Sequence, residues 1–166
     1  MNQSEEFIKK LELQKHPEGG WFRECFRSEI IIPAFALPDH KADRCCYTSI
    51  FYLLEENDFS SFHRLKSDEL WYYHQGDCVE IFSIDPDGKL QRNLLGKDID
   101  NGHQMQIVIP AGCWFAAQAV SSGKYALMGC MVSPGFDFDD FEMGNAENLI
   151  QKFPQHEEVI KKFCRN

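Results

Sequence analysis

The chain has 166 residues, a length that suits one domain with a single hydrophobic core. Hydrophobic residues make up 43% and charged residues 26%, a composition that excludes intrinsic disorder and collagen-like structure. Acidic residues outnumber lysine and arginine by 26 to 17, and the resulting net charge of -9 would repel phosphate backbones and anionic membranes. We therefore expect neither nucleic acid nor a membrane as a partner.

The N-terminal segment and the cysteines together predict a cytoplasmic location. Residues 1–13 carry charges where a signal peptide would need an apolar stretch, and no run of about 18 uncharged apolar residues follows. The seven cysteines are an odd number without a C-x-x-C pair, which indicates reduced, buried thiols. They are Cys25, Cys45, Cys46, Cys78, Cys113, Cys130 and Cys164.

In chain order, a helix is predicted over about residues 4–14, because Ser4 can cap it and apolar residues fall on one face. Pro17, Gly19 and Gly20 end it. Short runs rich in β-branched and aromatic residues then alternate with turn residues as far as about residue 142, which is typical of strands. The expected strands are 21–32, 47–54, 69–74, 78–84, 106–109, 114–120 and 125–132. Helical patterns return between about residues 146 and 164, so the sequence predicts one all-β domain over residues 1–166 with short helices at both ends.

The segment 62–76 carries the strongest chemical signal. Strand alternation places Glu69, Trp71 and Tyr73 on one face, and His63 can join them across a turn. An imidazole, a carboxylate and a phenol that face one interior form a cluster suited to acid–base catalysis, with His63 as the base and Tyr73 as the proton donor. The competing interpretation of His63 is a buried core histidine bonded to a carbonyl.

Two further features of the sequence bear on this site. Alternation from Trp21 places Arg23 and Arg27 on one face, either in solvent or as a clamp for a carboxylate or phosphate in a pocket of this or a neighbouring subunit. Buried Glu69 would need a partner, for which His63, Arg64 and Arg23 are the candidates.

His16 and His40 are assigned to the surface or to turns. The alternating aromatic and acidic residues of 135–142 are interpreted as an edge segment, because they lack the spacing of a calcium loop.

These residues resemble the motifs of the cupin superfamily. His63, Leu65, Glu69 and Gly76 have the spacing of the first cupin motif, and Pro110-Ala111-Gly112 followed by Phe115 that of the second. A more specific resemblance, to the DUF985 or Cupin-5 family, covers about residues 8–145. It is carried by HPEGGWF at 16–22, by FHRLKSDELW at 62–71, by PAGCW at 110–114, and by residues 134–136 and 141–142.

The resemblance implies a double-stranded β-helix, the cupin jelly roll, which is usually a homodimer and is related in structure to metal-free sugar-nucleotide epimerases. Cupin metal sites use three histidines and one glutamate. Here Leu65 and Phe115 stand at two of the histidine positions, so only His63 and Glu69 remain as weak candidate ligands, and we expect no metal or other cofactor.

We therefore expect a protein that binds a small sugar-like or anionic molecule, with isomerase or epimerase chemistry that needs no metal. The expected catalytic residues are His63, Tyr73 and Glu69, and the expected ligand-binding residues are Arg23, Trp71 and Phe115. Two alternatives remain open: a non-catalytic ligand-binding or structural dimer, and a metal-dependent cupin enzyme with an incomplete ligand shell.

Overall fold

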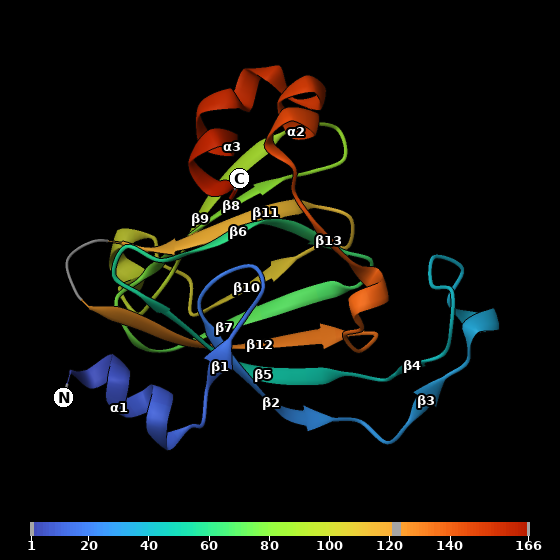
Figure 1. Cartoon of the computed structure of the whole chain (residues 1–166), viewed down its shortest axis with the longest axis horizontal. Coiled ribbons are helices and arrows are strands. Elements are labelled where there is room, and N and C mark those ends of the chain that lie inside the picture. The colour runs from blue at the N-terminus through green and yellow to red at the C-terminus, as the bar shows by residue number, and fades with distance from the viewer. Residues whose placement is uncertain (1, 121–123, 166) are drawn as a thin grey trace.

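The computed structural model describes residues 2–120 and 124–165 and shows two antiparallel sheets that face each other (Figure 1). The six-stranded sheet has the order β1-β2-β5-β12-β7-β10, and the five-stranded sheet the order β13-β6-β11-β8-β9. Apart from β1–β2 and β8–β9, the strands that pair in these two sheets are not consecutive in the chain, which is the topology of a double-stranded β-helix jelly roll. The fold class predicted from the sequence is confirmed.

The strands are β1 Gln14–Lys15, β2 Trp21–Arg27, β3 Ile31–Ile32, β4 Arg44–Cys45, β5 Thr48–Glu55, β6 Phe59–Leu65, β7 Asp68–Gly76, β8 Val79–Ile84, β9 Leu90–Leu95, β10 Gln106–Ile109, β11 Trp114–Ala119, β12 Tyr125–Ser133 and β13 Phe141–Met143. The α-helices are α1 Gln3–Lys10, α2 Ala146–Lys152 and α3 Glu157–Phe163, and the short 3₁₀ turns are η1 Ala34–Ala36, η2 Ile99–Asn101, η3 Phe138–Asp140 and η4 Pro154–His156.

The main core lies between the two sheets, where β5 and β7 contribute Tyr52 and Trp71 and the opposite sheet contributes Ile81 and Phe115. All four side chains are essentially inaccessible to solvent. Because this core occupies only part of the space between the sheets, the remainder is free to form a cavity at one end.

Helices lie on the outer sides of both sheets (Figure 1). Helices α2 and α3 cover the five-stranded sheet through an aromatic cluster that includes Phe62, Trp114 and Phe163. Helix α1 packs Phe7 and Ile8 near the outer face of the six-stranded sheet. None of the helices in the described ranges is long and apolar enough to cross a membrane.

Two elements differ from the sequence-based expectation at their ends. The N-terminal helix begins earlier, because Asn2 rather than Ser4 caps it: the Asn2 side chain accepts from the Ser4 amide, and Glu5 completes a capping box. The long strand expected over 21–32 ends at Arg27, after which the chain leaves the barrel as an arm over residues 28–46. Within the arm only β3 and β4 pair, with Ile31 opposite Cys45 (Figure 1).

Candidate active site

A cavity of about 220 Å³ opens at one end of the space between the sheets. Its walls come from both sheets, from the loop 16–20 that precedes β2, and from the segment 136–141 that crosses the mouth. The lining residues are His16, Glu18, Phe22, Glu24, Arg27, Thr48, Ile50, Tyr52, His63, Leu65, Glu69, Trp71, Cys130, Val132, Phe136, Asp137, Phe138 and Phe141. Carboxylates and imidazoles thus share an enclosed space with aromatic walls.

The loop 16–20 turns Glu18 into the cavity because two glycines follow it. Gly19 and Gly20 have φ values of 115° and 69°, a region that side-chain-bearing residues rarely adopt. A Cβ on Gly19 would also collide with the carbonyl oxygen of Phe59. The resulting path leaves Glu18 buried, with its Oε1 accepting a 2.8 Å hydrogen bond from the Ser60 hydroxyl.

The other oxygen of Glu18 lies between two imidazoles. Glu18 Oε2 is 3.2 Å from His63 Nε2 and 3.3 Å from His16 Nδ1, and all three side chains are buried. His63 Nδ1 lies 2.8 Å from the Ser61 carbonyl oxygen. A carbonyl can only accept, so Nδ1 carries a proton and Nε2 is the nitrogen that faces Glu18.

This geometry requires a proton between Glu18 and His63. A neutral His63 with its proton on Nδ1 would direct a lone pair from Nε2 at a carboxylate oxygen, which is repulsive. The contact is favourable when either the ring or the carboxyl holds one additional proton, which then lies in the hydrogen bond between Glu18 and His63. Burial lowers the pKa of His16, although Glu18 opposes this effect, so the nearby His16 ring favours the neutral form.

Glu69 and Trp71 face the cavity from alternate positions of β7, because Asp68 before them and Leu70 between them point to the opposite side. Burial raises the pKa of Glu69 to about 8, and the nearby charge of Glu18 adds to the rise. The Trp71 indole and the Cys130 thiol oppose that rise only in part. At neutral pH Glu69 is therefore a protonated acid rather than a carboxylate.

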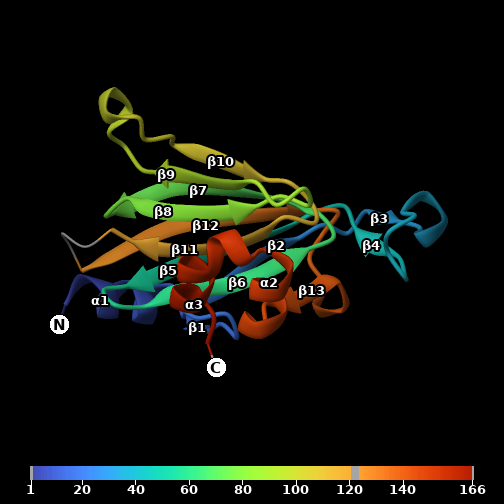
Figure 2. The same ribbon diagram turned by 90° about the horizontal axis from the view of Figure 1, so that it is seen from above.

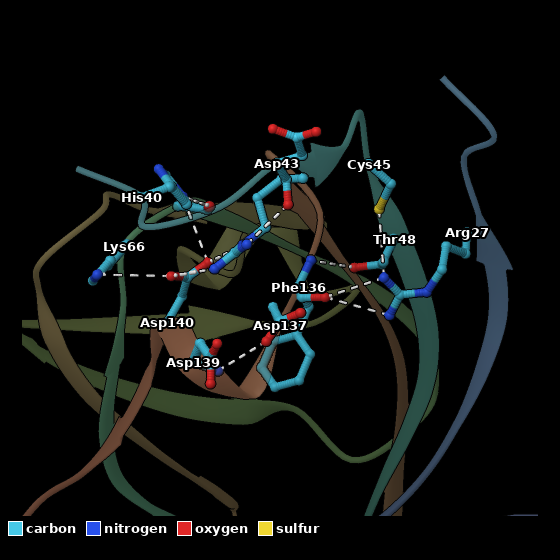
Figure 3. Close-up of polar contacts among 12 residues, drawn as sticks. Arg27, His40, Asp43, Cys45, Thr48, Lys66, Phe136, Asp137, Asp139 and Asp140 are labelled. Atoms are coloured by element: carbon cyan, nitrogen blue, oxygen red, sulfur yellow. Dashed lines mark hydrogen bonds and ion pairs between the residues drawn. The ribbon is translucent and has the colours of Figure 1, made fainter. Parts of the chain in front are cut away.

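The segment 136–141 forms the wall of the cavity mouth and is held in place at both ends (Figure 3). At one end the amide of Phe136 donates to Thr48 Oγ1 at 3.0 Å, and the Arg27 guanidinium donates to the Phe136 carbonyl at 3.3 Å. At the other end Arg44 donates to both oxygens of Asp140, at 2.5 and 2.9 Å. These bonds position Phe138 and Phe141 against the loop that carries His16.

A family model described as "Cupin superfamily (DUF985)" matches residues 5–144, most of the chain. The chain belongs to this cupin family. A curated protein of Saccharomyces cerevisiae, named as uncharacterised, is 28% identical over 157 residues, which cover 89% of this chain and 78% of the yeast protein.

Solved structures agree with this assignment. A protein of Leishmania major, titled hypothetical, has a TM-score of 0.90 at 35% identity and covers 99% of this chain and 100% of its own. A crystal structure from Shewanella oneidensis has a TM-score of 0.87 at 42% identity, with 99% of each chain covered. Oxalate decarboxylase of Bacillus subtilis has a TM-score of 0.54 at 17% identity over 90% of this chain and 36% of the enzyme, a likeness of fold alone.

The site does not fit the usual cupin metal shell. Leu65 lines the cavity at one histidine position, and at another the Phe115 ring packs 4.1 Å from the His63 ring, centroid to centroid. His63 faces the Ser61 carbonyl and Glu18 with its two nitrogens, and Glu69 is a neutral acid. Within the described ranges no group of three or more His, Cys, Asp or Glu side chains could hold a metal ion.

Of the six residues expected at the site, His63, Glu69 and Trp71 line the cavity together. Phe115 lies behind His63 as part of the core. Tyr73 faces the same core but lies further along β7, outside the cavity, where its hydroxyl donates to the Gly76 carbonyl at 2.7 Å. The structure therefore does not bring Tyr73 to His63.

Arg23 also lies outside the cavity and contacts Glu12 at 3.4 Å. It does not share a face with Arg27, because the pairing of β2 with β5 shifts between Glu24 and Phe26. That bulge turns Arg27 to the cavity side, where Glu24 accepts two bonds from its guanidinium. The partners expected for Glu69 are absent too, since its Oε2 has no hydrogen-bond partner in the described part of the chain.

Sequence reasoning missed Glu18 and the cavity-lining role of His16, which was assigned to the surface or a turn. His40 was misplaced in the same way, because it is buried beside Asp140 with its Nε2 3.7 Å from Oδ2. The segment 135–142 contributes its phenylalanines to the cavity wall. The available signal was the HPEGG run itself, since a glutamate followed by two glycines can be turned inward by a backbone that other residues cannot adopt.

Proposed function

We propose that this cupin binds a small polar molecule in the cavity and rearranges it by proton transfer without a metal, as a sugar isomerase or epimerase does. One observation carries the proposal: a proton-sharing Glu18–His63 pair and the protonated acid Glu69 line the same enclosed cavity. A base and an acid held in different protonation states at one pH are what such chemistry needs.

The proposed step conserves atoms and charge. The Glu18–His63 pair takes a proton from the carbon next to a carbonyl group, while Glu69 gives its proton to the carbonyl oxygen, which produces an enediol. Return of a proton to the other carbon gives an isomer, and its return to the opposite face of the same carbon gives an epimer. Glu69 then recovers a proton from the oxygen that becomes the carbonyl of the product, which is the same oxygen in the epimer and the neighbouring hydroxyl oxygen in the isomer.

The test does not require the product to be known. In D₂O, proton abstraction replaces the C–H hydrogen next to a carbonyl with deuterium, which ¹H NMR detects in a panel of aldoses and ketoses. Glu18→Gln and His63→Asn should each slow exchange by about 100-fold or more, the usual size of an acid–base contribution. His74→Asn is the matched control, because His74 is exposed and lies outside the cavity.

The outcomes separate the alternatives. Binding without exchange for every compound would favour a non-catalytic ligand-binding protein, and exchange only after Mn²⁺, Fe²⁺, Ni²⁺ or Zn²⁺ is added would favour a metal-dependent enzyme. Tyr73→Phe and Glu69→Gln compare the two possible proton donors. Loss of exchange in the tyrosine variant with retention in the glutamine variant would assign that role to Tyr73.

We also propose that a second copy of the chain covers the arm 28–46. The arm extends beyond the barrel and exposes Ile30, Ile31 and Phe35 by 70%, 56% and 92% (Figures 1 and 2). A two-stranded sheet such as β3–β4 is only marginally stable when it stands alone. A homodimer, which resemblance to the family leads us to expect, would give this apolar surface a partner of the same composition.

A further inference from the structure

Two buried polar atoms of the cavity lack partners. Neither Trp71 Nε1 nor Glu69 Oε2 makes a hydrogen bond of ordinary geometry with a described residue, although the indole is near enough to Glu69 to lower its pKa and Trp71 is only 1% and Glu69 7% exposed. Buried polar atoms are almost always bonded, so an unbonded pair in a cavity indicates a group that the ligand supplies. Both atoms belong to one face of β7 and therefore act on the same region of the cavity.

Both atoms act as hydrogen-bond donors. An indole nitrogen can only donate. For Glu69 the decisive fact is the charge that acts on it, which comes from Glu18 and the Cys130 thiol. The imidazoles of His16 and His63 also line the cavity, but both are directed at Glu18 Oε2. Arg27, the cation that lines the cavity, is occupied by Glu24 and the Phe136 carbonyl. A carboxylate at position 69 would be uncompensated, so the group keeps its proton and donates it.

Two donors that converge on one region select an acceptor oxygen with two lone pairs. A carbonyl oxygen meets that requirement, whereas an ammonium group would leave the Trp71 N–H unbonded. The rest of the lining argues against an anion. Glu18, Glu24 and Asp137 contribute acidic groups, and the guanidinium of Arg27 is already bonded.

We propose that the ligand is a small uncharged hydroxy-aldehyde or hydroxy-ketone whose carbonyl oxygen accepts hydrogen bonds from Trp71 Nε1 and the Glu69 carboxyl. This inference rests on the proposed function and narrows its ligand from sugar-like or anionic compounds to neutral carbonyl compounds. It gives the two β7 side chains a common task, which is to hold and polarise the oxygen at which charge develops during enediol formation. The phenylalanines of the mouth would enclose the carbon chain.

The experiment compares three four-carbon probes that differ in one functional group: L-erythrulose, a ketone; erythritol, which has no carbonyl; and erythronate, a carboxylate. Binding is measured by isothermal titration and ligand-observed NMR at pH 6.5. We expect erythrulose to bind at least tenfold more tightly than either of the others. Equal binding of erythritol, or tighter binding of erythronate, would overturn the inference.

Variants at the two donors test the assignment. Trp71→Phe keeps an aromatic ring but loses the N–H, and we expect erythrulose affinity to fall by about three- to tenfold. Glu69→Gln keeps a donor that cannot ionise, so binding should persist, while Glu69→Leu should weaken it. Thermal unfolding verifies that each variant is folded. If Trp71→Phe does not fold, the comparison of Glu69→Gln with Glu69→Leu tests the donor role.

The pH dependence gives an independent readout. Erythrulose affinity of the native chain should fall about tenfold per pH unit above the Glu69 pKa of about 8, and it should stay flat in Glu69→Gln. A native profile that is flat to pH 10 would contradict the donor role. Carbonyl-selective binding without deuterium exchange would disprove the proposed catalysis and leave this inference standing. Deuterium exchange on ligands that bind without carbonyl preference would disprove this inference and leave the proposed catalysis standing.

Discussion

Replacing Asp140 with asparagine should destabilise the protein by about 3 kcal/mol, because it leaves a buried guanidinium without its counter-charge. Arg44 and Asp140 are 5% and 7% exposed, and the two residues, 96 positions apart, make a two-bonded ion pair. Lys66 lies 3.8 Å from the same carboxylate, so its charge also loses a partner, and the His40 ring lies 3.7 Å from it (Figure 3). Asparagine keeps the shape of the side chain, so the loss is one of charge.

The size of the effect follows from burial. An exposed ion pair contributes only about 0–1 kcal/mol, whereas breaking a buried one costs about 3–5 kcal/mol. Glu142→Gln is the matched control, because the Arg64–Glu142 pair lies nearby with side chains 38% and 55% exposed. Urea unfolding followed by tryptophan fluorescence at pH 7 compares both variants with the native chain.

The double variant Arg44→Met/Asp140→Leu refines the test. Removal of both charges should cost less than Asp140→Asn alone, since no unpaired ion stays buried. Hydrogen exchange of the amides at 136–141 should become faster in Asp140→Asn, because that carboxylate holds one end of the segment. The reasoning is refuted if Asp140→Asn and Glu142→Gln cost the same, within about 0.5 kcal/mol.

Two further predictions concern protonation and assembly. Burial and Glu18 raise the pKa of Glu69 to about 8 in the folded chain against an ordinary value of 4.5, so its contribution to stability is complete below pH 4.5 and is lost as the pH rises towards 8. Urea titrations give the free energy of unfolding of the native chain and of Glu69→Gln. The difference between the two, native minus variant, should fall by about 1.4 kcal/mol per pH unit between pH 5.5 and 7.5. A difference that does not change with pH would show that Glu69 ionises normally. Phe35→Asp should convert the proposed homodimer into a monomer in light scattering, with Ile99→Asp as the control that stays dimeric, because Ile99 is apolar, 64% exposed and outside both the arm and the cavity lining. An unchanged mass for Phe35→Asp would remove the arm from the interface.

Local rules were sufficient for the parts of the fold and site that depend on neighbours in sequence. The two-residue period of a strand placed Glu69 and Trp71 on the inner face of β7, where the structure has them. The same rule failed for Arg27, because a bulge after Glu24 shifts the register of β2 and a bulge has no simple sequence signature. Periodicity also could not show that Tyr73 lies beyond the cavity, since position along a strand is set by the partner strands.

Glu18 shows a different limit. The glycines that follow it predicted a turn, and the turn is present with positive φ at both. What the turn brings together, however, is Glu18 with Ser60 and His63, residues more than 40 positions away on β6. Such contacts arise from the closure of the barrel. A segment that the sequence predicts only as a turn therefore supplies one of the carboxyl groups of the site.

The departures from the cupin metal motif and the protonated acid have one physical cause. Leu65 and Phe115 replace imidazoles that would bring polarity and a cation to the site, and the apolar surroundings that result disfavour a charge on Glu69. A residue at the position of an anionic ligand in a metal-binding cupin is thereby a protonated acid here, which is the form that the proposed function requires. Restoring histidine at positions 65 and 115 should then lower the Glu69 pKa, so the loss of the metal motif and the gain of an acid are two aspects of one change.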